Sequence, residues 1–321
     1  MAASDSLPLV FAAALTDPGR KRALNEDSVS QQVTNYGGVF VVADGMGGHR
    51  TGEVASQMSV NAITDTLRKA EPSPKALIEA FEVANEAIYG AGQKPESRGM
   101  GTTCTVLLLD LPYAIVGHVG DSRAYLLRDG NLIQLTQDHS WVADRMRQGL
   151  LTEEEARNHR WRNVITNALG SFPSAKVDLV GVKVRSGDMF LICSDGLSGV
   201  LEDKVLTEMM LTNPPEPAVA KLIKLANDWG GPDNISAVVL AIGTHVPQGS
   251  RPYALPLETA DGPVHLSNGL DPEVLTTQIG EPPKKKSFWE RYGTQILLSL
   301  LIALTGLLIY NQWVLTTTPT P

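Results

Sequence analysis

The sequence predicts an α+β fold in which antiparallel sheets are flanked by pairs of helices. First, apolar runs typical of strands follow one another with short connections, and Asp129-Gly130 directly after one of them fits a hairpin turn. Second, the helical stretches come in two pairs instead of alternating singly with strands, which disfavours a parallel sheet. Together these observations indicate one compact domain over residues 9–243.

The elements follow in a simple order along the chain. Apolar runs at 9–15 and 38–43 predict two strands. Apolar residues at helical spacing then predict helices over 51–70 and 74–91. The rest of the domain repeats this pattern, with strands predicted at 103–109, 113–119, 123–128, 177–184, 188–193 and 235–241, and helices at 202–211 and 216–229.

A polar and charged stretch at 141–162 interrupts the later strands. Within it, Thr152-Glu153-Glu154-Glu155 resembles a capping box that opens a short helix. We therefore expect this stretch to be a surface insertion.

The segments outside the domain differ from it in composition. Residues 1–8 predict a tail without the features of a signal peptide, and 244–287, rich in Pro, Gly and polar residues, predict a disordered linker. Residues 288–315 predict a juxtamembrane and transmembrane helix, because 295–310 carry no charge and the run reaches the roughly 20 residues that span a bilayer. A short tail, 316–321, follows.

The residues that flank this helix predict its orientation. Lys284, Lys285, Lys286 and Arg291 precede the uncharged run at 295–310 and no basic residue follows it, so a single-pass membrane protein with a cytoplasmic domain is expected. The alternative is a buried core helix, which is disfavoured because a core helix rarely lacks charge on every face.

The overall balance of residues disfavours some partners. The chain has 321 residues, a net charge of −8 and a pI near 5.3, which argues against nucleic acid as a main partner. The two cysteines, Cys104 and Cys193, lie within apolar runs and are expected to be buried thiols. The lack of a disulfide framework fits a reducing compartment.

Five aspartates, most of them beside a glycine, are candidates for one site, and four of them closely follow an apolar run: Asp27, Asp44, Asp121, Asp195 and Asp233. A strand that ends in Asp-Gly brings a carboxylate to the rim of its sheet, and several such strands suggest convergence. Converging carboxylates repel one another unless cations neutralise them, and hard divalent cations prefer oxygen ligands. We therefore expect a metal site. Magnesium or manganese is favoured over zinc, because no His and Cys residues cluster at zinc spacing.

Two features near these aspartates point to phosphate chemistry. Asp44 could bridge two ions while Gly45 lets its backbone carbonyl approach a cation, although Asp-Gly alone is usually a turn. Arg22 offers a guanidinium fork that suits phosphate, although it could also be one more solvated charge beside Arg20 and Lys21. The glycines after Asp44 match neither the dinucleotide fingerprint nor the P-loop.

Six motifs occur in one order along the chain: Arg22…Asn25-Glu26-Asp27, Asp44-Gly45-Met46-Gly47-Gly48, Gly101-Thr102-Thr103, Gly120-Asp121-Ser122-Arg123, Ser194-Asp195-Gly196-Leu197 and Asp233-Asn234. Over residues 9–243 this set resembles the bacterial metal-dependent serine/threonine protein phosphatases of the PP2C (PPM) family. The resemblance implies an α-β-β-α sandwich, with two antiparallel sheets face to face and a helix pair outside each.

The same resemblance implies a role for each candidate site residue. Two Mn²⁺ or Mg²⁺ ions would be held by Asp44, Asp195 and Asp233 together with the carbonyl of Gly45, and Asp44 would bridge them. Glu26 and Asp27 would hold waters bound to the ions, and Asp121 would bind a weaker third ion together with Asp195. Arg22 would bind the substrate phosphate. The partners implied are phosphorylated proteins and a bacterial Ser/Thr kinase whose signalling the enzyme would reverse.

The implied reaction is direct attack of metal-activated water on phosphorus, without a phosphoenzyme. The general acid is open: Met46 stands where some eukaryotic members have His, and either His49 or a metal-bound water could serve. We favour a structural role for His49, His118 and His139. Residues 141–162 correspond to a variable flap beside the site in bacterial members.

Two other functions remain open at the level of the sequence. A pseudophosphatase would recognise phosphoproteins without turnover, but none of the implied inner metal ligands is missing. A different metallohydrolase would act on small phosphate esters, and a comparison of phosphopeptide with free phosphoamino acid would separate the two activities.

Overall fold

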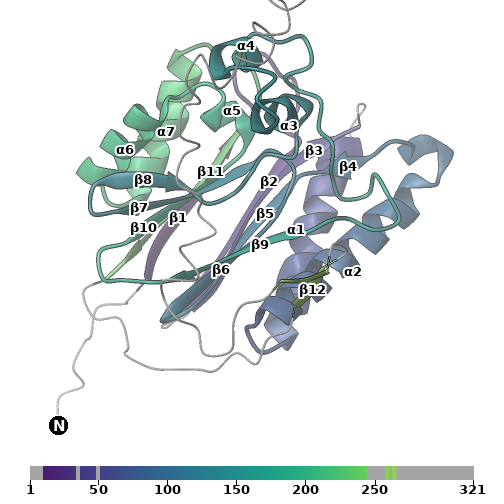
Figure 1. Cartoon of the computed structure of the whole chain (residues 1–321), viewed down its shortest axis with the longest axis horizontal. Coiled ribbons are helices and arrows are strands. Elements are labelled where there is room, and N and C mark those ends of the chain that lie inside the picture. Colours follow the sequence, from purple (N-terminus) through teal and green to yellow (C-terminus); the bar gives the residue numbers. More distant parts are fainter. Residues whose placement is uncertain (1–9, 34–36, 48–50, 244–256, 260–261, 265–321) are drawn as a thin grey trace, which may run out of the picture. The chain divides into compact units, whose positions relative to one another are not determined.

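The computed structural model describes residues 10–33, 37–47, 51–243, 257–259 and 262–264. Within them two antiparallel sheets form the centre of the domain (Figure 1). The first sheet has six strands, of which five run in the order β2 (Asp27–Val33), β3 (Gly37–Met46), β5 (Cys104–Asp110), β6 (Tyr113–Val119) and β9 (Asp178–Lys183), while β4 (Gly101–Thr102) pairs with the end of β3.

The second sheet has five strands. Their order is β1 (Val10–Asp17), β11 (Ile235–Ile242), β10 (Met189–Cys193), β7 (Arg123–Arg128) and β8 (Asn131–Gln134). The first strand of the domain therefore pairs with the last, so Asp17 lies opposite Ile235. This pairing brings the loop that follows β1 next to the loop that precedes β11, and both loops carry predicted site residues.

A pair of helices covers the outer face of each sheet (Figure 1). The helices α1 (Thr51–Lys69) and α2 (Pro74–Gly92) pack on the first sheet, and α6 (Asp203–Thr212) and α7 (Pro215–Asp228) pack on the second. Ile63 and Phe81 of the first pair are fully buried against strand residues such as Val106. The predicted architecture, two antiparallel sheets flanked by helix pairs, is therefore confirmed.

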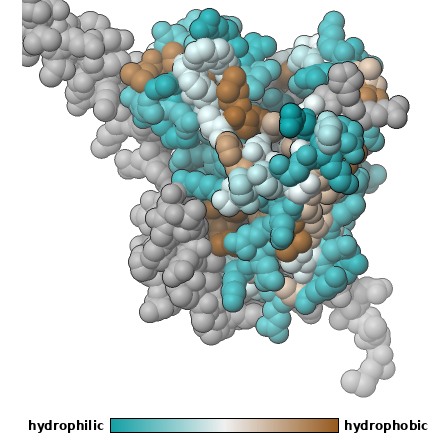
Figure 2. All heavy atoms as spheres, turned by 90° about the vertical axis from the view of Figure 1, so that its right-hand side faces the viewer, coloured by the Kyte–Doolittle hydropathy of each residue, from teal (hydrophilic) through white to brown (hydrophobic). Residues whose placement is uncertain are grey.

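The two sheets face each other across a layer of apolar side chains, separate from the side chains that pack against the helices. Phe40, Leu107 and Val116 are fully buried, and they alternate along their strands with residues that pack against α1 and α2. Because successive side chains of a strand point to opposite faces, these three face the other sheet. The outer surface over α1 and α2 is mainly hydrophilic, with apolar side chains showing between polar ones (Figure 2), as expected for amphipathic helices.

The insertion predicted at 141–162 holds two short helices, α3 (Trp141–Arg147) and α4 (Glu153–Arg157). The capping box at Thr152 is present: the Thr152 side chain accepts from the Glu155 backbone N–H, and the Glu155 carboxylate accepts from the Thr152 N–H. The ring of Trp141 stacks on that of His159 and meets Trp161 edge-on. These aromatic contacts join the two ends of the insertion.

Three short elements complete the description. They are the 3-10 turn η1 (Pro95–Ser97), the helix α5 (Asp195–Ser198), and a hairpin of β12 (Leu257–Thr259) with β13 (Gly262–Val264). The hairpin lies within 244–287, which was predicted to be a disordered linker; the rest of that range, and the helix predicted at 288–315, lie outside the described residues. Among the residues that are described, none of the helices has the length and apolar character to cross a membrane.

Candidate metal centre and active site

The five predicted aspartates gather where the two sheets meet at one end. Asp27 begins β2 and pairs directly with Asp44 near the end of β3. Asp195 opens α5 directly after β10, and Asp233 stands just before β11. Asp121 follows β6 and interacts electrostatically with Asp44 and Asp195. The structure thus brings together carboxylates that lie far apart in the sequence.

Their mutual repulsion changes their acidity. Burial, with the nearby charges of Asp195 and Asp233, raises the pKa of Asp27 to about 7, although a hydrogen bond from Ser194 works in the opposite direction. Burial raises the pKa of Asp44 well above its usual range, and Asp27, Asp195 and Asp121 add to this effect. The pKa values of Asp121 and Asp195 are raised by the same two causes. The site is therefore electrostatically unfavourable until positive charge enters it.

Three oxygen atoms at this site are buried without a hydrogen-bond partner among the described residues. They are Oε1 of Glu26, Oδ1 of Asp27 and Oδ1 of Asp195. A buried carboxylate oxygen without a partner loses its hydration and receives nothing in return, which is costly unless a cation or an ordered water binds it. The donor set consists of oxygen atoms only, which suits Mn²⁺ or Mg²⁺. The residues present therefore fit the ions that the resemblance implies.

Hydrogen bonds from outside the acidic set hold the carboxylate of Asp27. The hydroxyl of Ser194 donates to Oδ2 of Asp27 at 2.8 Å, and the same hydroxyl accepts from the backbone N–H of Ser236 at 3.0 Å. Ser194 follows β10 and Ser236 lies in β11, so this chain of bonds joins one sheet to the other. One oxygen of Asp27 is therefore fixed, and the other has no hydrogen-bond partner in the part of the chain that the structure describes.

The backbone of Asp44 is fixed by two threonines. The Thr103 hydroxyl accepts from the Asp44 N–H at 3.0 Å, and the Thr103 N–H donates to the Asp44 carbonyl at 2.9 Å. The Thr102 hydroxyl donates to the same carbonyl at 2.9 Å. Thr103 also shares a hydrogen bond of 2.8 Å with the hydroxyl of Ser122, the residue after Asp121. Through these contacts the Gly101-Thr102-Thr103 motif holds the backbone of Asp44 and links it to the residue after Asp121.

Gly45 is required by close backbone contacts. A Cβ atom on it would lie 2.0 Å from the carbonyl oxygen of Gly52 and 2.7 Å from that of Glu26. A Cβ atom on Gly52 would in turn lie 2.8 Å from the Gly45 oxygen and 2.5 Å from Oε1 of Glu26. The predicted ligand oxygens of Gly45 and Glu26 therefore lie close to each other. Gly52, which has no Cβ atom, leaves room for both.

Arg22, the predicted phosphate ligand, pairs with an acid of the set. Its Nη2 lies 2.7 Å from Oδ2 of Asp233, while Asn234 N–H donates to Oδ1 of Asp233 at 2.9 Å. Both Asp233 oxygens are thus engaged. Within the part of the chain that the structure describes, no three acidic, histidine or cysteine side chains stand close enough together to hold an ion as they are. The guanidinium supplies the positive charge at Asp233, and a cation could take this place.

Asn234 fixes the loops on either side of the site. Its Oδ1 accepts from the Glu26 N–H at 2.8 Å, and its Nδ2 donates to the carbonyls of Pro18 and Leu24 at 3.0 and 2.8 Å. The sequence motifs contained Asn234, Ser194, Thr103 and Ser122, but no role was predicted for any of them. Their position beside the aspartates was the only available signal. The candidate general acid His49 lies outside the described residues.

A sandwich of two sheets that gathers carboxylates and an arginine at one end fits one class of protein, the metal-dependent phosphatases. Comparison with known proteins agrees. The family described as protein phosphatase 2C matches residues 19–233. The chain therefore belongs to the protein phosphatase 2C family of metal-dependent protein serine/threonine phosphatases, and the resemblance in its motifs is confirmed.

Individual relatives support this assignment. The protein phosphatase PhpP of Streptococcus pneumoniae is 36% identical over 238 residues, which span 71% of this chain and 96% of PhpP. The serine/threonine protein phosphatase PstP of Mycobacterium tuberculosis is 40% identical over 233 residues, which span 71% of this chain and 44% of PstP. Both similarities cover most of the domain.

Solved structures agree with the fold. A crystal structure of PstP from M. tuberculosis superposes with a TM-score of 0.68 at 38% identity, covering 73% of this chain and 99% of the other. The catalytic domain of PstP in complex with two manganese ions gives a TM-score of 0.65 at 38% identity, covering 73% of this chain and 98% of the other. Stp1 from Staphylococcus aureus gives 0.69 at 31% identity, with 73% and 95% covered.

Proposed function

We propose that this chain hydrolyses phosphoserine and phosphothreonine on proteins by direct attack of water on phosphorus, at a centre that binds two Mn²⁺ or Mg²⁺ ions and a weaker third. The single observation that carries the proposal is the convergence of five carboxylates beside the guanidinium of Arg22. Two of the five have a buried oxygen that finds no partner among the described residues. The two manganese ions bound to the related PstP domain support it.

The oxygen atoms of four residues would hold the two ions: Asp44, Gly45, Asp195 and Asp233. When bound, such ions lower the pKa of a nearby water and neutralise charge on the phosphoryl oxygens. The chain's own residues set the geometry. Thr103 fixes the backbone of Asp44, and Ser194 fixes one oxygen of Asp27, which leaves Oδ1 of Asp27 and Oε1 of Glu26 to hold waters of the ions.

Arg22 would bind the substrate phosphate. Its side chain is 48% exposed and already lies in the acidic set, so it can reach both the ions' ligands and an incoming phosphate. A guanidinium group donates two parallel hydrogen bonds to a tetrahedral anion, which an ammonium group does not reproduce. The arginine would exchange its partner Asp233 for phosphate once an ion neutralises that acid.

The purified full chain should release phosphate from a phosphothreonine peptide in Mn²⁺ and stop in EDTA. Asp44→Asn should lose this activity, because it removes the charge of a carboxylate that would hold the ions. Asp129→Asn is the matched control: Asp129 lies in the turn between β7 and β8 with φ of 51°, a conformation that Asn accepts. Full activity in EDTA, or equal rates of Asp44→Asn and wild type, would reject the proposal.

The substrate class needs a second comparison. Phosphopeptide should be hydrolysed much faster than free phosphoserine, and the reverse preference would favour a hydrolase of small phosphate esters. We further propose that the phosphorylated proteins include a bacterial Ser/Thr kinase and its substrates. The support is the family of protein phosphatases to which the chain belongs.

We also propose that residues 288–315 anchor the domain to the cytoplasmic face of a membrane. The support is the uncharged run at 295–310 with basic residues only on its N-terminal side. Removal of 284–321 should release the protein from the membrane fraction of cells. A truncated chain that stays with the membranes would contradict the anchor.

A further inference from the structure

The backbone around Asp121 is held in an unusual conformation. Gly120, which precedes it, has φ of +111°, and a Cβ atom there would lie 2.5 Å from Cβ of Thr103. Only glycine fits this position. Since Asp121 is buried and its backbone follows directly from Gly120, whatever holds Gly120 also decides where the carboxylate of Asp121 lies.

His139 holds Gly120 at both of its polar backbone groups. The His139 N–H donates to the Gly120 carbonyl at 2.7 Å, and the Gly120 N–H donates to Nδ1 of the His139 ring at 3.1 Å. Because Nδ1 accepts a hydrogen bond, the ring carries its proton on Nε2. Nε2 lies 3.0 Å from Oδ2 of Asp178 and donates to it.

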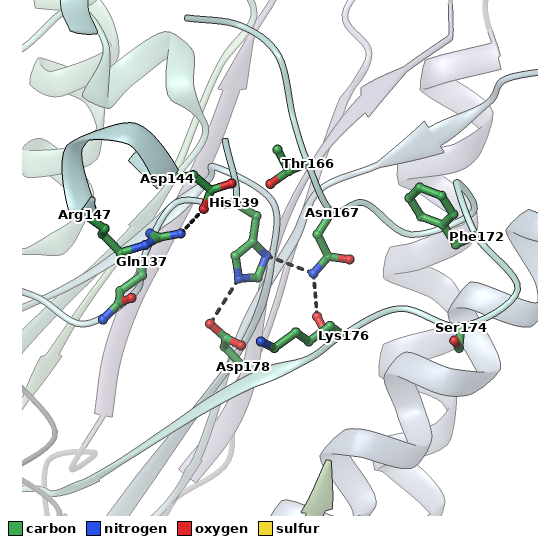
Figure 3. Close-up of a pocket in the computed structure, with 10 residues that line it drawn as sticks. All are labelled: Gln137, His139, Asp144, Arg147, Thr166, Asn167, Phe172, Ser174, Lys176 and Asp178. Carbon is green, nitrogen blue, oxygen red and sulfur yellow. Dashed lines mark hydrogen bonds and ion pairs between the residues drawn. The ribbon is translucent and has the colours of Figure 1, made fainter. Parts of the chain in front are cut away.

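The ring itself is fixed on its other sides. Asn167 Nδ2 lies 3.0 Å from Nδ1 of His139 and also donates to the Lys176 carbonyl at 2.6 Å. Figure 3 shows the ring between Asp178 and Asn167 on the wall of a cavity of about 520 Å³. The ring of His118 packs on its inner side, with centroids 4.9 Å apart. His139 is only 8% exposed, so its orientation is set entirely by protein groups.

Asp121 therefore lies between two residues that are each held by hydrogen bonds. On one side Ser122 is tied to Thr103, which also holds the backbone of Asp44. On the other side Gly120 is tied to His139, which is anchored to Asp178 in β9. The hydrogen bond of Ser122 alone leaves the backbone free to rotate at Gly120, the glycine next to Asp121.

We propose that His139 is a positioning residue that, through Gly120, holds the Asp121 carboxylate in place for the weaker third ion. The proposal rests on the proposed function, because the ion belongs to it. In His139→Asn, the amide oxygen can take the place of Nδ1 and accept from the Gly120 N–H. In His139→Gln, the amide reaches the place of Nε2 and Asp178 instead, and the Gly120 N–H loses its partner.

The test is Mn²⁺ binding to the metal-free full chain, followed by electron paramagnetic resonance. Wild type should bind two ions tightly and a third more weakly, and Asp121→Asn should lose the third. His139→Gln should weaken the third ion about ten- to hundredfold, the usual effect of losing a residue that orients a metal ligand. His139→Asn should bind it nearly as wild type does, and all variants should keep the two tight ions.

The outcomes separate this inference from the proposed function. Equal binding of the third ion by His139→Gln and wild type, or equal losses in the Gln and Asn variants, would overturn the inference alone. So would a third ion that survives Asp121→Asn. A wild-type chain that binds no Mn²⁺ would overturn the proposed function as well. In wild type, the ¹⁵N spectrum of His139 should show an unprotonated Nδ1, and a protonated Nδ1 would refute the inference even if a variant did not fold.

Discussion

Substitution of Asp27 by asparagine should stabilise the metal-free chain at neutral and alkaline pH. Asp27 is buried, and burial with the charges of Asp195 and Asp233 raises its pKa from 3.8 to about 7. Between these two values the folded chain binds more protons than the unfolded chain, so the free energy of unfolding falls as pH rises. At about 1.4 kcal/mol for each pKa unit, the ionised carboxylate costs the fold about 4 kcal/mol above pH 7, and nothing below pH 3.8.

The assay is urea unfolding of the EDTA-treated full chain, followed by far-ultraviolet circular dichroism, at pH 5, 6, 7 and 8. From pH 5 to pH 8, titration of Asp27 alone should remove about 3 kcal/mol from the wild type. The raised pKa values of Asp44, Asp121 and Asp195 act in the same direction, so the wild-type decline should be steeper still. The difference between wild type and Asp27→Asn gives the contribution of Asp27 together with its repulsion of Asp44, and both have the same sign.

Asparagine keeps an oxygen that can accept from the Ser194 hydroxyl, so the variant removes charge without removing this contact. At pH 8 in EDTA the variant should be the more stable protein. Added Mn²⁺ should reverse the order, because cations favour ionised carboxylates and bind the folded wild type more tightly. Parallel stability curves for the two proteins from pH 5 to pH 8, or a less stable variant at pH 8 in EDTA, would refute this reasoning.

Three further predictions follow from other contacts. Arg22→Lys should raise KM for a phosphopeptide about tenfold with little change in melting temperature, because lysine keeps the charge but loses the fork; an unchanged KM would contradict phosphate binding by Arg22. Gly45→Ala should lose Mn²⁺ binding by calorimetry, because its Cβ would lie 2.0 Å from the Gly52 oxygen, whereas Gly90→Ala in α2 has open space and should bind normally. Phe81→Ala should destabilise the domain by about 3–5 kcal/mol in urea unfolding, since the ring is fully buried, and a loss below about 1 kcal/mol would show that the core refills the space.

The parts of the fold that follow from local sequence were predicted well. The helices expected at 51–70 and 74–91 are α1 at Thr51–Lys69 and α2 at Pro74–Gly92, because apolar residues at helical spacing bury one face of each. The hairpin at Asp129-Gly130 is also present, with both residues at positive φ, as this kind of turn requires. Spacing and turn chemistry are properties of neighbouring residues, so the sequence displays them directly.

The strand β2, Asp27–Val33, was not predicted. It has only two apolar residues in seven, Val29 and Val33, so it shows no alternation. It is an edge strand that exists because β3 offers it a partner, and the sequence does not display such pairing between distant segments. The helix α3, Trp141–Arg147, was missed for a similar reason, since only Val142 and Ala143 of it are buried.

The candidate metal centre could be predicted as a set of residue types but not as an arrangement. Aspartates beside glycines indicated which carboxylates converge, and the motifs added Arg22 and Glu26. The sequence could not show that Arg22 pairs with Asp233, or that Ser194 and Thr103 hold the acids in place. These contacts depend on the pairing and docking of both sheets, which arise only when the whole domain folds.

The hydrogen bonds from Ser194 to Asp27 and from Glu26 to Asn234 each run from one sheet of the sandwich to the other. Neither layer carries a complete site, so chemistry here requires that the two layers stay in register. A slight slip between them would separate the acids while leaving every helix and strand intact. Such a chain would keep its circular dichroism spectrum but lose its catalytic activity. The turnover rate therefore reports how firmly the two sheets are joined.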